Sequence, residues 1–355
     1  MTNNESTTPR VAVAMSGGVD SAVSALLLKT QYDTVAGVTM RLYSEHNEDP
    51  ESDDIRDARA VAERLGIPHL VCDLGTEFRR LVMDAFCEEY AAGRTPNPCV
   101  VCNKHIKFGA LLDFVRAQGY DTIATGHYAR LERDAHDRIR IRVAADASKD
   151  QTYVLWSLTQ EILRHVRFPL GEITKAEARA LAEQNGFTNA HRRDSQDICF
   201  IPDGDYVAFL SRYANMTPTP GSYLSTDGSV IGTHKGMLCY TIGQRKGLGM
   251  SFGKHMFVCA KNAKDNTVTL CDGEELFSTT LLAHSANFIS GEFPVAPIRV
   301  QAKIRYAQKA ADATVFPLPD GRVRVEFDQP QRAIAPGQSV VFYDGEYLLG
   351  GGIIE

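Results

Sequence analysis

The sequence lacks several features that would place it in other classes of protein. It contains no run of about 18 apolar residues, which excludes a membrane-spanning helix of ordinary length. Residues 1–10 are polar and lack the charged start and apolar core of a leader, so we expect no signal peptide. Eight cysteines in 355 residues are too sparse for a disulfide-stapled secreted domain. We therefore expect a cytoplasmic protein.

The sequence also lacks an excess of basic residues. It carries 38 lysines and arginines against 44 aspartates and glutamates, which gives a formal net charge of −6. This balance argues against a protein that coats nucleic acid regardless of sequence, although it is compatible with a local basic face. The hydrophobic share of 44% and the charged share of 23% are those of an ordinary globular protein. The length of 355 residues predicts two or three domains.

The most informative stretch lies between a predicted strand at 11–15 and a predicted helix from residue 22. It reads Ala14-Met15-Ser16-Gly17-Gly18-Val19-Asp20-Ser21. A strand, a Gly-Gly turn and a helix N-terminus leave backbone N–H groups without internal partners, and the helix dipole adds to this anion site. We expect the hydroxyls of Ser16 and Ser21 to add donors and Asp20 to orient the loop or hold Mg²⁺. The stretch is not a Walker A loop, because no Gly-Lys-Ser/Thr follows it.

The order of the predicted elements indicates an α/β fold at the start of the chain. Apolar runs predict strands and amphipathic stretches predict helices in alternation: strands at 34–40, 69–74 and 122–125, and helices at 55–65 and 104–118. This alternation favours a doubly wound parallel sheet, in which ligands bind at the carboxyl ends of the strands. Residues 16–21 and Gly126 both fall at such ends. The acidic stretch 45–54 between two of these elements is typical of a solvated loop.

The pattern changes after about residue 205, where glycines separate short stretches of alternating polarity. These stretches predict strands of a small β-rich domain followed by a β-barrel. We therefore expect three domains: a catalytic domain over 1–206, a small central domain over 207–277 and a C-terminal β-barrel over 278–355.

Three cysteines lie in polar surroundings, unlike Cys72 and Cys87, whose apolar neighbours indicate a core position. Cys99 and Cys102 fall in a proline-rich stretch just before the helix at 104–118, and Cys199 follows much later. The predicted helix N-terminus and the lysines at 104 and 107 would lower the pKa of Cys102 relative to that of a buried thiol and favour its thiolate.

Three interpretations of these cysteines compete. A zinc knuckle usually needs two close cysteine pairs, and the sequence holds no second CxxC, so zinc is disfavoured. An iron–sulfur cluster on Cys99, Cys102 and Cys199, with one open iron, is compatible with thiolate ligands. In the third interpretation one cysteine carries a persulfide and another resolves it by thiol–disulfide exchange.

Seven motifs in order along the chain resemble those of the tRNA-specific 2-thiouridylases, within the N-type ATP pyrophosphatases. They are SGGVDS at 16–21, NPCVVCNKHIKF at 97–108, ATGHYAR at 124–130, KDQTYVLW at 149–156, DSQDICFI at 194–201, YTIGQRKGLG at 240–249 and APGQSVVFYDGE at 335–346. The resemblance implies a transferase that replaces the C2 oxygen of the wobble uridine with sulfur, at the expense of ATP and with Mg²⁺. It also implies a central domain that recognises tRNA, lysine, glutamate and glutamine tRNAs as substrates, and a cysteine desulfurase or sulfur-relay protein as donor.

The resemblance assigns roles to individual residues. The loop at 14–21, Met40 and Gly126 would bind ATP, with Met40 against the base. Cys199 would carry the persulfide and Cys102 would act as the nucleophile, and the two could close a disulfide. The target base, flipped out of its stack, would contact Asn97, Pro98 and Cys99, and the remaining tRNA contacts are assigned to Lys149, Asp150, Gln151, Arg305 and Tyr306.

Two features qualify these roles. Some relatives have aspartate at the position of Cys99, so the cysteine here weakens a general-base role and favours the 4Fe–4S cluster somewhat more. The window 293–311 carries lysines and arginines without an acid, which fits an RNA face on which Tyr306 stacks.

Two other functions are compatible with part of the sequence. A ligase or amidotransferase with the same pyrophosphate loop would explain 16–21 but neither Cys102 nor Cys199. A non-catalytic RNA-binding protein would need no intact loop and no polar-loop cysteines. Release of pyrophosphate that depends on tRNA distinguishes the enzyme from both.

Overall fold

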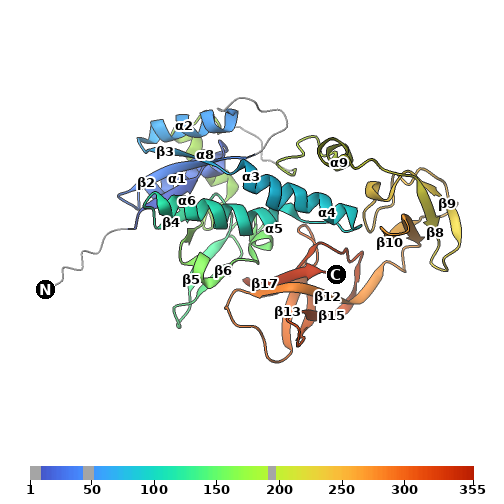
Figure 1. Cartoon of the computed structure of the whole chain (residues 1–355). Helices are drawn as coiled ribbons and strands as arrows, with labels where there is room; N and C mark the ends of the chain where they lie inside the picture. Colours follow the sequence, from blue (N-terminus) through green and yellow to red (C-terminus); the bar gives the residue numbers. More distant parts are fainter. Residues whose placement is uncertain (1–8, 43–51, 191–196) are drawn as a thin grey trace.

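The computed structural model describes residues 9–42, 52–190 and 197–355, so most of the acidic stretch 45–54 and residues 194–196 lie outside the described residues. It consists of an N-terminal unit that ends with the helix α9, a central unit over 221–271 and a barrel unit over 277–354 (Figure 1). No helix within the described ranges is both long and apolar enough to cross a membrane.

The N-terminal unit is built on a parallel sheet, as the sequence predicts. Its strands run in the order β3 (His69–Asp73), β2 (Val35–Arg41), β1 (Val11–Ala14), β4 (Thr122–Ala124) and β7 (Val166–Arg167). Each neighbouring pair is parallel. Because β1 lies between β2 and β4, the chain leaves the sheet in opposite directions there, and this switch point is where doubly wound sheets bind ligands.

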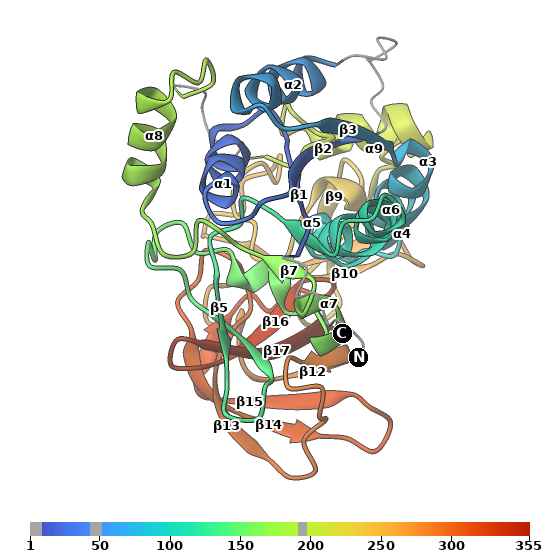
Figure 2. The same ribbon diagram turned by 90° about the vertical axis from the view of Figure 1, so that its left-hand side faces the viewer.

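Helices cover both faces of this sheet (Figure 2). One face carries α1 (Val19–Lys29), α2 (Asp53–Leu65) and α8 (Lys175–Gln184), whose apolar sides pack on alternate residues of β1 such as Val11 and Val13. The other face carries the helices between β3 and β4: α3 (Gly75–Phe78), η1 (Arg79–Asp84), α4 (Ala85–Ala91), α5 (Pro98–Cys102), η2 (Asn103–Ala110) and α6 (Leu111–Ala117). The α8 N-terminus has a full capping box between Thr174 and Glu177.

The helix predicted over 104–118 starts six residues earlier than the sequence pattern indicated. The segments α5, η2 and α6 follow one another directly, so the helical run extends from Pro98 to Ala117. Asn97 caps it by accepting the N–H of Cys99 at 3.1 Å, and proline at the first helical position costs no hydrogen bond. Cys99 and Cys102 therefore lie in the helix, and the prediction of a proline-rich loop at these positions was wrong.

Beyond the sheet, short elements lead to the β-rich units. The N-terminal unit also contains β5 (Arg130–Arg133), β6 (Ile139–Arg142), η3 (Thr152–Leu155), α7 (Gln160–Leu163) and α9 (Tyr206–Ala214). The central unit contains β8 (Gly221–Leu224), β9 (Val230–His234), η4 (Met237–Cys239), β10 (Phe257–Asn262) and β11 (Thr267–Cys271), with the strand order β10-β11-β8-β9.

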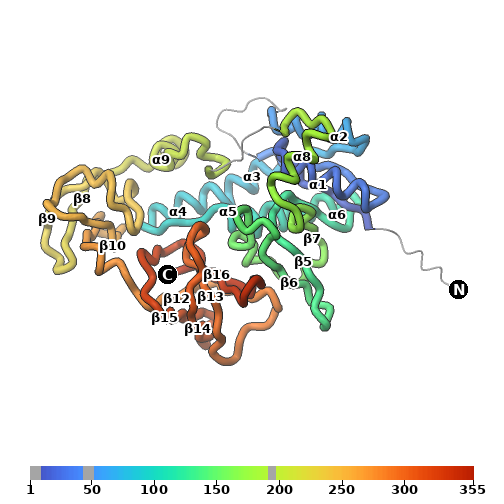
Figure 3. The backbone as a smooth tube through the Cα atoms, turned by 180° about the vertical axis from the view of Figure 1, so that it is seen from behind, coloured from blue at the N-terminus to red at the C-terminus, as the bar shows by residue number. Residues whose placement is uncertain are grey.

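The barrel unit is antiparallel and closes on itself. Its strands are β12 (Phe277–Phe288), β13 (Ile298–Lys303), β14 (Ala311–Pro317), β15 (Val323–Arg332), β16 (Ser339–Asp344) and β17 (Tyr347–Ile354). They run in the order β12-β15-β14-β13-β16-β17, and β12 also pairs with β17. The hairpin of β5 and β6 pairs with β17 and so ties the N-terminal unit to the barrel (Figure 3). The predicted fold class is confirmed.

Candidate active site

The loop after β1 has the shape that the sequence predicts for an anion site. Gly17 adopts a positive φ of 69°, which glycine reaches without steric cost. The Ser21 hydroxyl donates to the Gly18 carbonyl at 2.9 Å and accepts the Ser16 N–H at 3.2 Å. Ser21 is buried, so its hydroxyl stabilises the loop from within and is not the additional donor to a ligand that we expected.

The donors of this loop are backbone N–H groups. Those of Gly18, Val19, Asp20 and Ser21 have no acceptor among the residues that the structure describes. The side chains of Met15 and Val19 are buried in the core, so these residues can offer a ligand only their backbone. A cluster of unpaired N–H groups at the N-terminus of α1 is suited to a phosphate chain.

Asp20 is held by two residues that the sequence does not point to. Lys175, at the first position of α8, contacts both carboxylate oxygens at 2.8 Å, and the Tyr128 hydroxyl donates to Oδ1 at 2.8 Å. The Lys175 side chain is only 9% exposed. Of the two roles expected for Asp20, orienting the loop fits this geometry directly, because both oxygens already have cationic or hydroxyl partners.

Gly126 and Met40 lie at the same edge of the sheet. A Cβ on Gly126 would lie 3.0 Å from the Asp20 Cβ and 3.2 Å from the Ser21 nitrogen, so glycine lets the segment after β4 approach the loop without a tight contact. Met40 lies half-buried near the carboxyl end of β2, the strand next to β1. Its contact with a nucleotide base stays a prediction.

The structure brings together the three cysteines singled out by the sequence. Cys99 and Cys102 come from α5, and Cys199 lies between Ile198 and Phe200, whose side chains pack into the core. Phe200 makes edge contacts with Phe78 and Phe86, with ring centroids 5.7 and 5.4 Å apart. Cys99 and Cys102 lie close enough to Cys199 for their charges to raise its pKa. We call Cys99, Cys102 and Cys199 the thiol cluster.

The pKa values of the thiol cluster contradict the expectation of a stabilised thiolate. Cys99 and Cys199 keep some exposed surface, but the protein packed around the sulfurs removes solvation, which disfavours the thiolate. Burial raises the pKa of Cys102 and Cys99, and it raises the pKa of Cys199 to about 12. Cys102 also lies a full turn inside the helix, where the N-terminal end of the dipole has less effect.

One lysine opposes this effect of burial. The positive charge of Lys107 lowers the pKa of all three thiols, although less than burial raises it. Lys107 lies in the π-helical segment η2, where hydrogen bonds join residues five apart, so it follows Cys102 by one turn. Lys104 is exposed and has no such effect on the thiols, contrary to the expectation that both lysines would act.

A metal centre at the thiol cluster finds no geometric support. Across the described part of the chain, no group of three or more His, Cys, Asp or Glu side chains is placed to hold a metal ion. The iron–sulfur interpretation of Cys99, Cys102 and Cys199 is therefore unsupported by the arrangement of these thiols.

The loop at 14–21 and the helical segment η2, which follows the two cysteines of α5, are connected through the residues just after β4. Gly126 packs on Asp20, and the next residue, His127, lies 5.9 Å from Phe108 between ring centroids. His127 is buried, bonds the Thr125 hydroxyl at 2.7 Å through Nδ1, and has a pKa held well below the usual value by burial and by Lys107. It therefore supports the structure as a neutral ring.

Part of the predicted tRNA-contact set lies next to the thiol cluster. The Tyr306 hydroxyl donates to the Asp150 carbonyl at 2.9 Å, and the Cys99 thiol influences the pKa of Tyr306. Tyr306 is 46% exposed, and its ring makes a T-shaped contact with the ring of Tyr153. Lys149 is half-buried in the turn before Asp150. Asn97, buried Pro98 and Cys99 lie at the start of α5.

Other members of this set are already used inside the protein. The Asp150 carboxylate accepts the Ala144 N–H and the Thr152 hydroxyl, and the Gln151 side chain accepts the Tyr128 N–H at 3.0 Å. Arg305 donates to the carbonyls of Ile242 and Ala333, both at 3.0 Å, and so joins the central and barrel units. Their contacts with tRNA stay predictions.

Not all basic side chains of the window 293–311 are free to contact RNA. Arg299 forms a two-pronged ion pair with Asp328 at 2.7 and 2.8 Å, and Lys303 lies half-buried beside the Tyr343 ring. Tyr306 is thus the member of this window whose exposed surface lies beside the thiol cluster.

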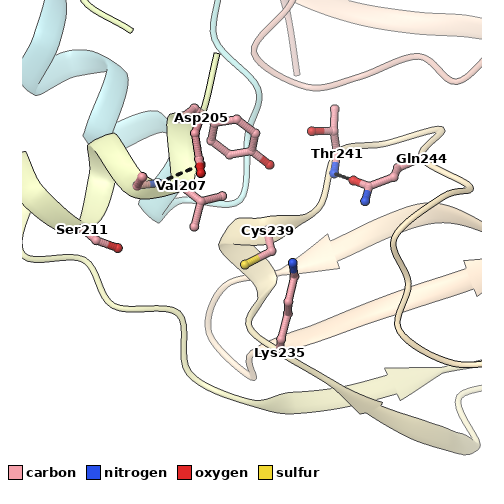
Figure 4. Close-up of a pocket in the computed structure, with 9 residues that line it drawn as sticks. Asp205, Val207, Ser211, Lys235, Cys239, Thr241 and Gln244 are labelled. Carbon is pink, nitrogen blue, oxygen red and sulfur yellow. Dashed lines mark hydrogen bonds between the residues drawn. The ribbon is translucent and has the colours of Figure 1, made fainter. Parts of the chain in front are cut away.

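A separate cavity of about 500 Å³ lies between α9 and the central unit. Figure 4 shows Lys235 and Cys239 of the central unit on one side, and Val207 and Ser211 of α9 with its N-cap residue Asp205 on the other. None of the residues that the sequence assigns to the site lines this cavity. The cavity is therefore distinct from the loop at 14–21 and from the thiol cluster.

Family models match the three units separately. A model described as "tRNA methyl transferase HUP domain" matches residues 9–203. A "tRNA methyl transferase PRC-barrel domain" matches 207–272, and an "Aminomethyltransferase beta-barrel domain" matches 278–354. These ranges lie close to the expected domains, although the exact boundaries stay predictions.

Curated relatives match almost the whole chain. A protein of Acetivibrio thermocellus named "tRNA-specific 2-thiouridylase MnmA" is 45% identical over 98% of this chain and 99% of its own. The protein of the same name from Treponema denticola is 46% identical over 98% of both chains. One from Thermoanaerobacter, named "tRNA-specific 2-thiouridylase MnmA 1", is 48% identical over 98% of both chains. The chain therefore belongs to the family of tRNA-specific 2-thiouridylases.

Proposed function

We propose that this chain is a cytoplasmic, ATP-dependent tRNA 2-thiouridylase, which replaces the C2 oxygen of the wobble uridine with sulfur and produces AMP and pyrophosphate. The observation that carries the proposal is the connection, through Gly126, His127 and η2, between the loop at 14–21 and the thiol cluster. One of these groups suits a polyphosphate and the other suits sulfur chemistry. The loop follows the carboxyl end of β1, and the chain belongs to the 2-thiouridylase family.

The first step activates a poor leaving group. The C2 oxygen of uridine attacks the α-phosphorus of ATP, the bond to the β,γ-pyrophosphate breaks, and the base becomes O-adenylated. The unpaired N–H groups of Gly18 to Ser21 would hold the departing pyrophosphate. Lys175 and Tyr128 keep Asp20 in place beneath these donors.

Mg²⁺ fits this site as a part of the ATP substrate. Asp20 is the acid of the loop, and its two oxygens already have Lys175 and Tyr128 as partners, so it does not form a ready-made metal site. We therefore assign Mg²⁺ to the phosphate oxygens of ATP, where it neutralises charge.

The second step transfers sulfur. The terminal sulfur of a persulfide on Cys199 attacks C2, and the bond from C2 to the adenylated oxygen breaks with release of AMP. The Cys102 thiolate then attacks the Cys199 sulfur, which leaves 2-thiouridine and a Cys102–Cys199 disulfide. The transferred sulfur is thereby reduced, the two cysteines are oxidised, and an external thiol must reduce them again.

The raised pKa values fit a site that is inactive at rest. Desolvation raises the pKa of Cys102 and Cys199 and so disfavours their thiolates, and we propose that bound substrate changes these surroundings when the attacking thiolate forms. Lys107 is the cation placed to stabilise this thiolate.

We assign the substrate and partners by the family. The RNA is tRNA for lysine, glutamate and glutamine, and the sulfur comes from a cysteine desulfurase or a sulfur-relay protein. Supporting observations for an RNA site are the exposed Tyr306 ring beside the thiol cluster and the helix start at Asn97, Pro98 and Cys99.

The test is nucleoside mass spectrometry of unmodified tRNA incubated with the protein, ATP, Mg²⁺ and a sulfur donor. We expect a 2-thiouridine peak that requires ATP. Release of pyrophosphate without any thiolated nucleoside would refute the sulfur half of the proposal. The descriptions of two family models mention a tRNA methyl transferase. A methylated nucleoside in place of 2-thiouridine would therefore refute sulfur transfer as the reaction type. Protein purified with and without oxygen separates a persulfide from an oxygen-sensitive cluster.

A further inference from the structure

A buried amide contacts the nucleotide loop from the far end of α8. Asn189 follows this helix, is 6% exposed, and donates from Nδ2 to the Gly17 carbonyl at 2.8 Å. The two residues are 172 positions apart in the sequence. The Oδ1 atom of Asn189 is buried without a hydrogen-bond partner among the described residues. Among the described residues, the Asn189 side chain therefore makes its hydrogen bond to the Gly17 carbonyl through Nδ2.

The contact fixes the direction of one peptide group. In a trans peptide the C=O and the N–H point in opposite directions. Because the Gly17 carbonyl points to Asn189, the N–H of Gly18 in the same peptide points away from Asn189. This N–H has no acceptor among the described residues and lies at the N-cap of α1.

This peptide is the one in the loop that can turn over most easily. It joins two glycines, which reach both signs of φ at little cost. A reversed peptide would present the Gly17 oxygen, a negative dipole end, to an anion. The Ser21 hydroxyl holds two other peptides of the loop, Met15–Ser16 through the Ser16 N–H and Gly18–Val19 through the Gly18 carbonyl. Asn189 holds the peptide between them.

We propose that Asn189 is a positioning residue, which holds the Gly17–Gly18 peptide with its N–H toward the β,γ-phosphates of ATP. This inference rests on the proposed function for the identity of the anion. It predicts that Asn189 acts on polyphosphate binding and pyrophosphate release without touching substrate itself.

The test compares binding of pyrophosphate, ATP and AMP to the full chain by calorimetry. Asn189→Asp keeps the shape but replaces the donor by a carboxylate that repels the Gly17 oxygen, and Asn189→Leu removes the donor without adding charge. We expect either variant to weaken pyrophosphate and ATP binding by about tenfold or more, with AMP and tRNA binding within about twofold of the unchanged chain.

The matched control is Asn185→Asp. Asn185 lies at the other side of the same turn and donates from Nδ2 to the Leu181 carbonyl at 2.9 Å, away from the loop. This variant should bind pyrophosphate normally. Comparing its melting temperature with those of the Asn189 variants separates a loss of stability from a loss of binding.

Normal pyrophosphate binding in a folded Asn189 variant would overturn the inference. So would an equal loss of pyrophosphate and AMP affinity, which indicates general damage. If Asn189→Asp does not fold, the ratio of the two affinities in Asn189→Leu decides. Failure of the unchanged chain to bind ATP or pyrophosphate at all would instead refute the proposed function.

Discussion

Lys175 contacts both carboxylate oxygens of Asp20 at 2.8 Å, across 155 positions of sequence. The ion pair connects the start of α8 to the nucleotide loop, and the Asn189 amide connects the end of the same segment to it. The loop is therefore held at two points, Asp20 and Gly17, by the start of α8 and by the turn that follows this helix.

Asp20→Ala should abolish tRNA-dependent pyrophosphate release, because the loop loses the carboxylate that Lys175 and Tyr128 hold. It should also lower the free energy of unfolding by roughly 2–3 kcal/mol, since Lys175, 9% exposed, loses its carboxylate partner. Denaturant unfolding and a pyrophosphate assay measure the two effects.

The control separates stability from chemistry. In Asp20→Ala with Lys175→Met the buried charge is gone, so most of the stability should return while pyrophosphate release stays absent. Normal release in the single variant would exclude the loop from catalysis.

Lys107→Gln should move the pH dependence of cysteine alkylation to higher pH. The Lys107 charge lowers the pKa of Cys99, Cys102 and Cys199, so its removal raises these pKa values and leaves less reactive thiolate at any given pH. The measurement is the rate of iodoacetamide labelling between neutral and alkaline pH. Lys104→Gln is the matched control and should leave the profile unchanged. An unshifted profile in Lys107→Gln would contradict the electrostatic role.

Cys199→Ser should bind tRNA and release pyrophosphate normally but form no 2-thiouridine, because it cannot carry the persulfide. Nucleoside mass spectrometry and a pyrophosphate assay on the same reaction measure this. Cys239→Ser removes a half-exposed thiol at the separate cavity and should keep full activity. Formation of 2-thiouridine by Cys199→Ser would refute the assignment of Cys199 as the residue that carries the persulfide.

Tyr306→Phe and Tyr306→Ala separate stacking from hydrogen bonding. If the exposed ring stacks on a base of the bound tRNA, Tyr306→Ala should weaken tRNA binding by roughly 1–3 kcal/mol. Tyr306→Phe loses only the bond to the Asp150 carbonyl and should bind nearly as well. Filter binding at fixed salt measures both. Equal losses of tRNA affinity in the two variants would show that tRNA binding depends on the Tyr306 hydroxyl, which bonds Asp150 of the N-terminal unit, and not on stacking of the ring.

The turn at 16–21 between a strand and a helix, and the fold class, could be predicted because their causes are local. The Gly-Gly turn, the apolar run before it and the helix after it are neighbours in sequence, and their geometry follows from backbone sterics and helix dipoles. The alternation of strands and helices likewise predicts the parallel sheet, and the short alternating stretches predict the barrel. The start of the helix at Pro98 was missed, although Asn97 and Pro98 are a cap and a first-turn residue that could have marked it.

Long-range contacts decided the rest. Lys175, Tyr128 and Asn189 reach the loop from 108 to 172 positions away, and no local pattern ties a lysine in a capping box to an aspartate at a helix start. For Cys102 the sequence indicated the lysine at 107, which does lower the pKa, but not the burial that outweighs this effect and raises the pKa overall. The sequence by itself determined which residues can do chemistry, since that depends on their type and immediate neighbours. The tertiary structure decided which of them meet and how charged they are, because contact and desolvation arise only when distant segments pack together.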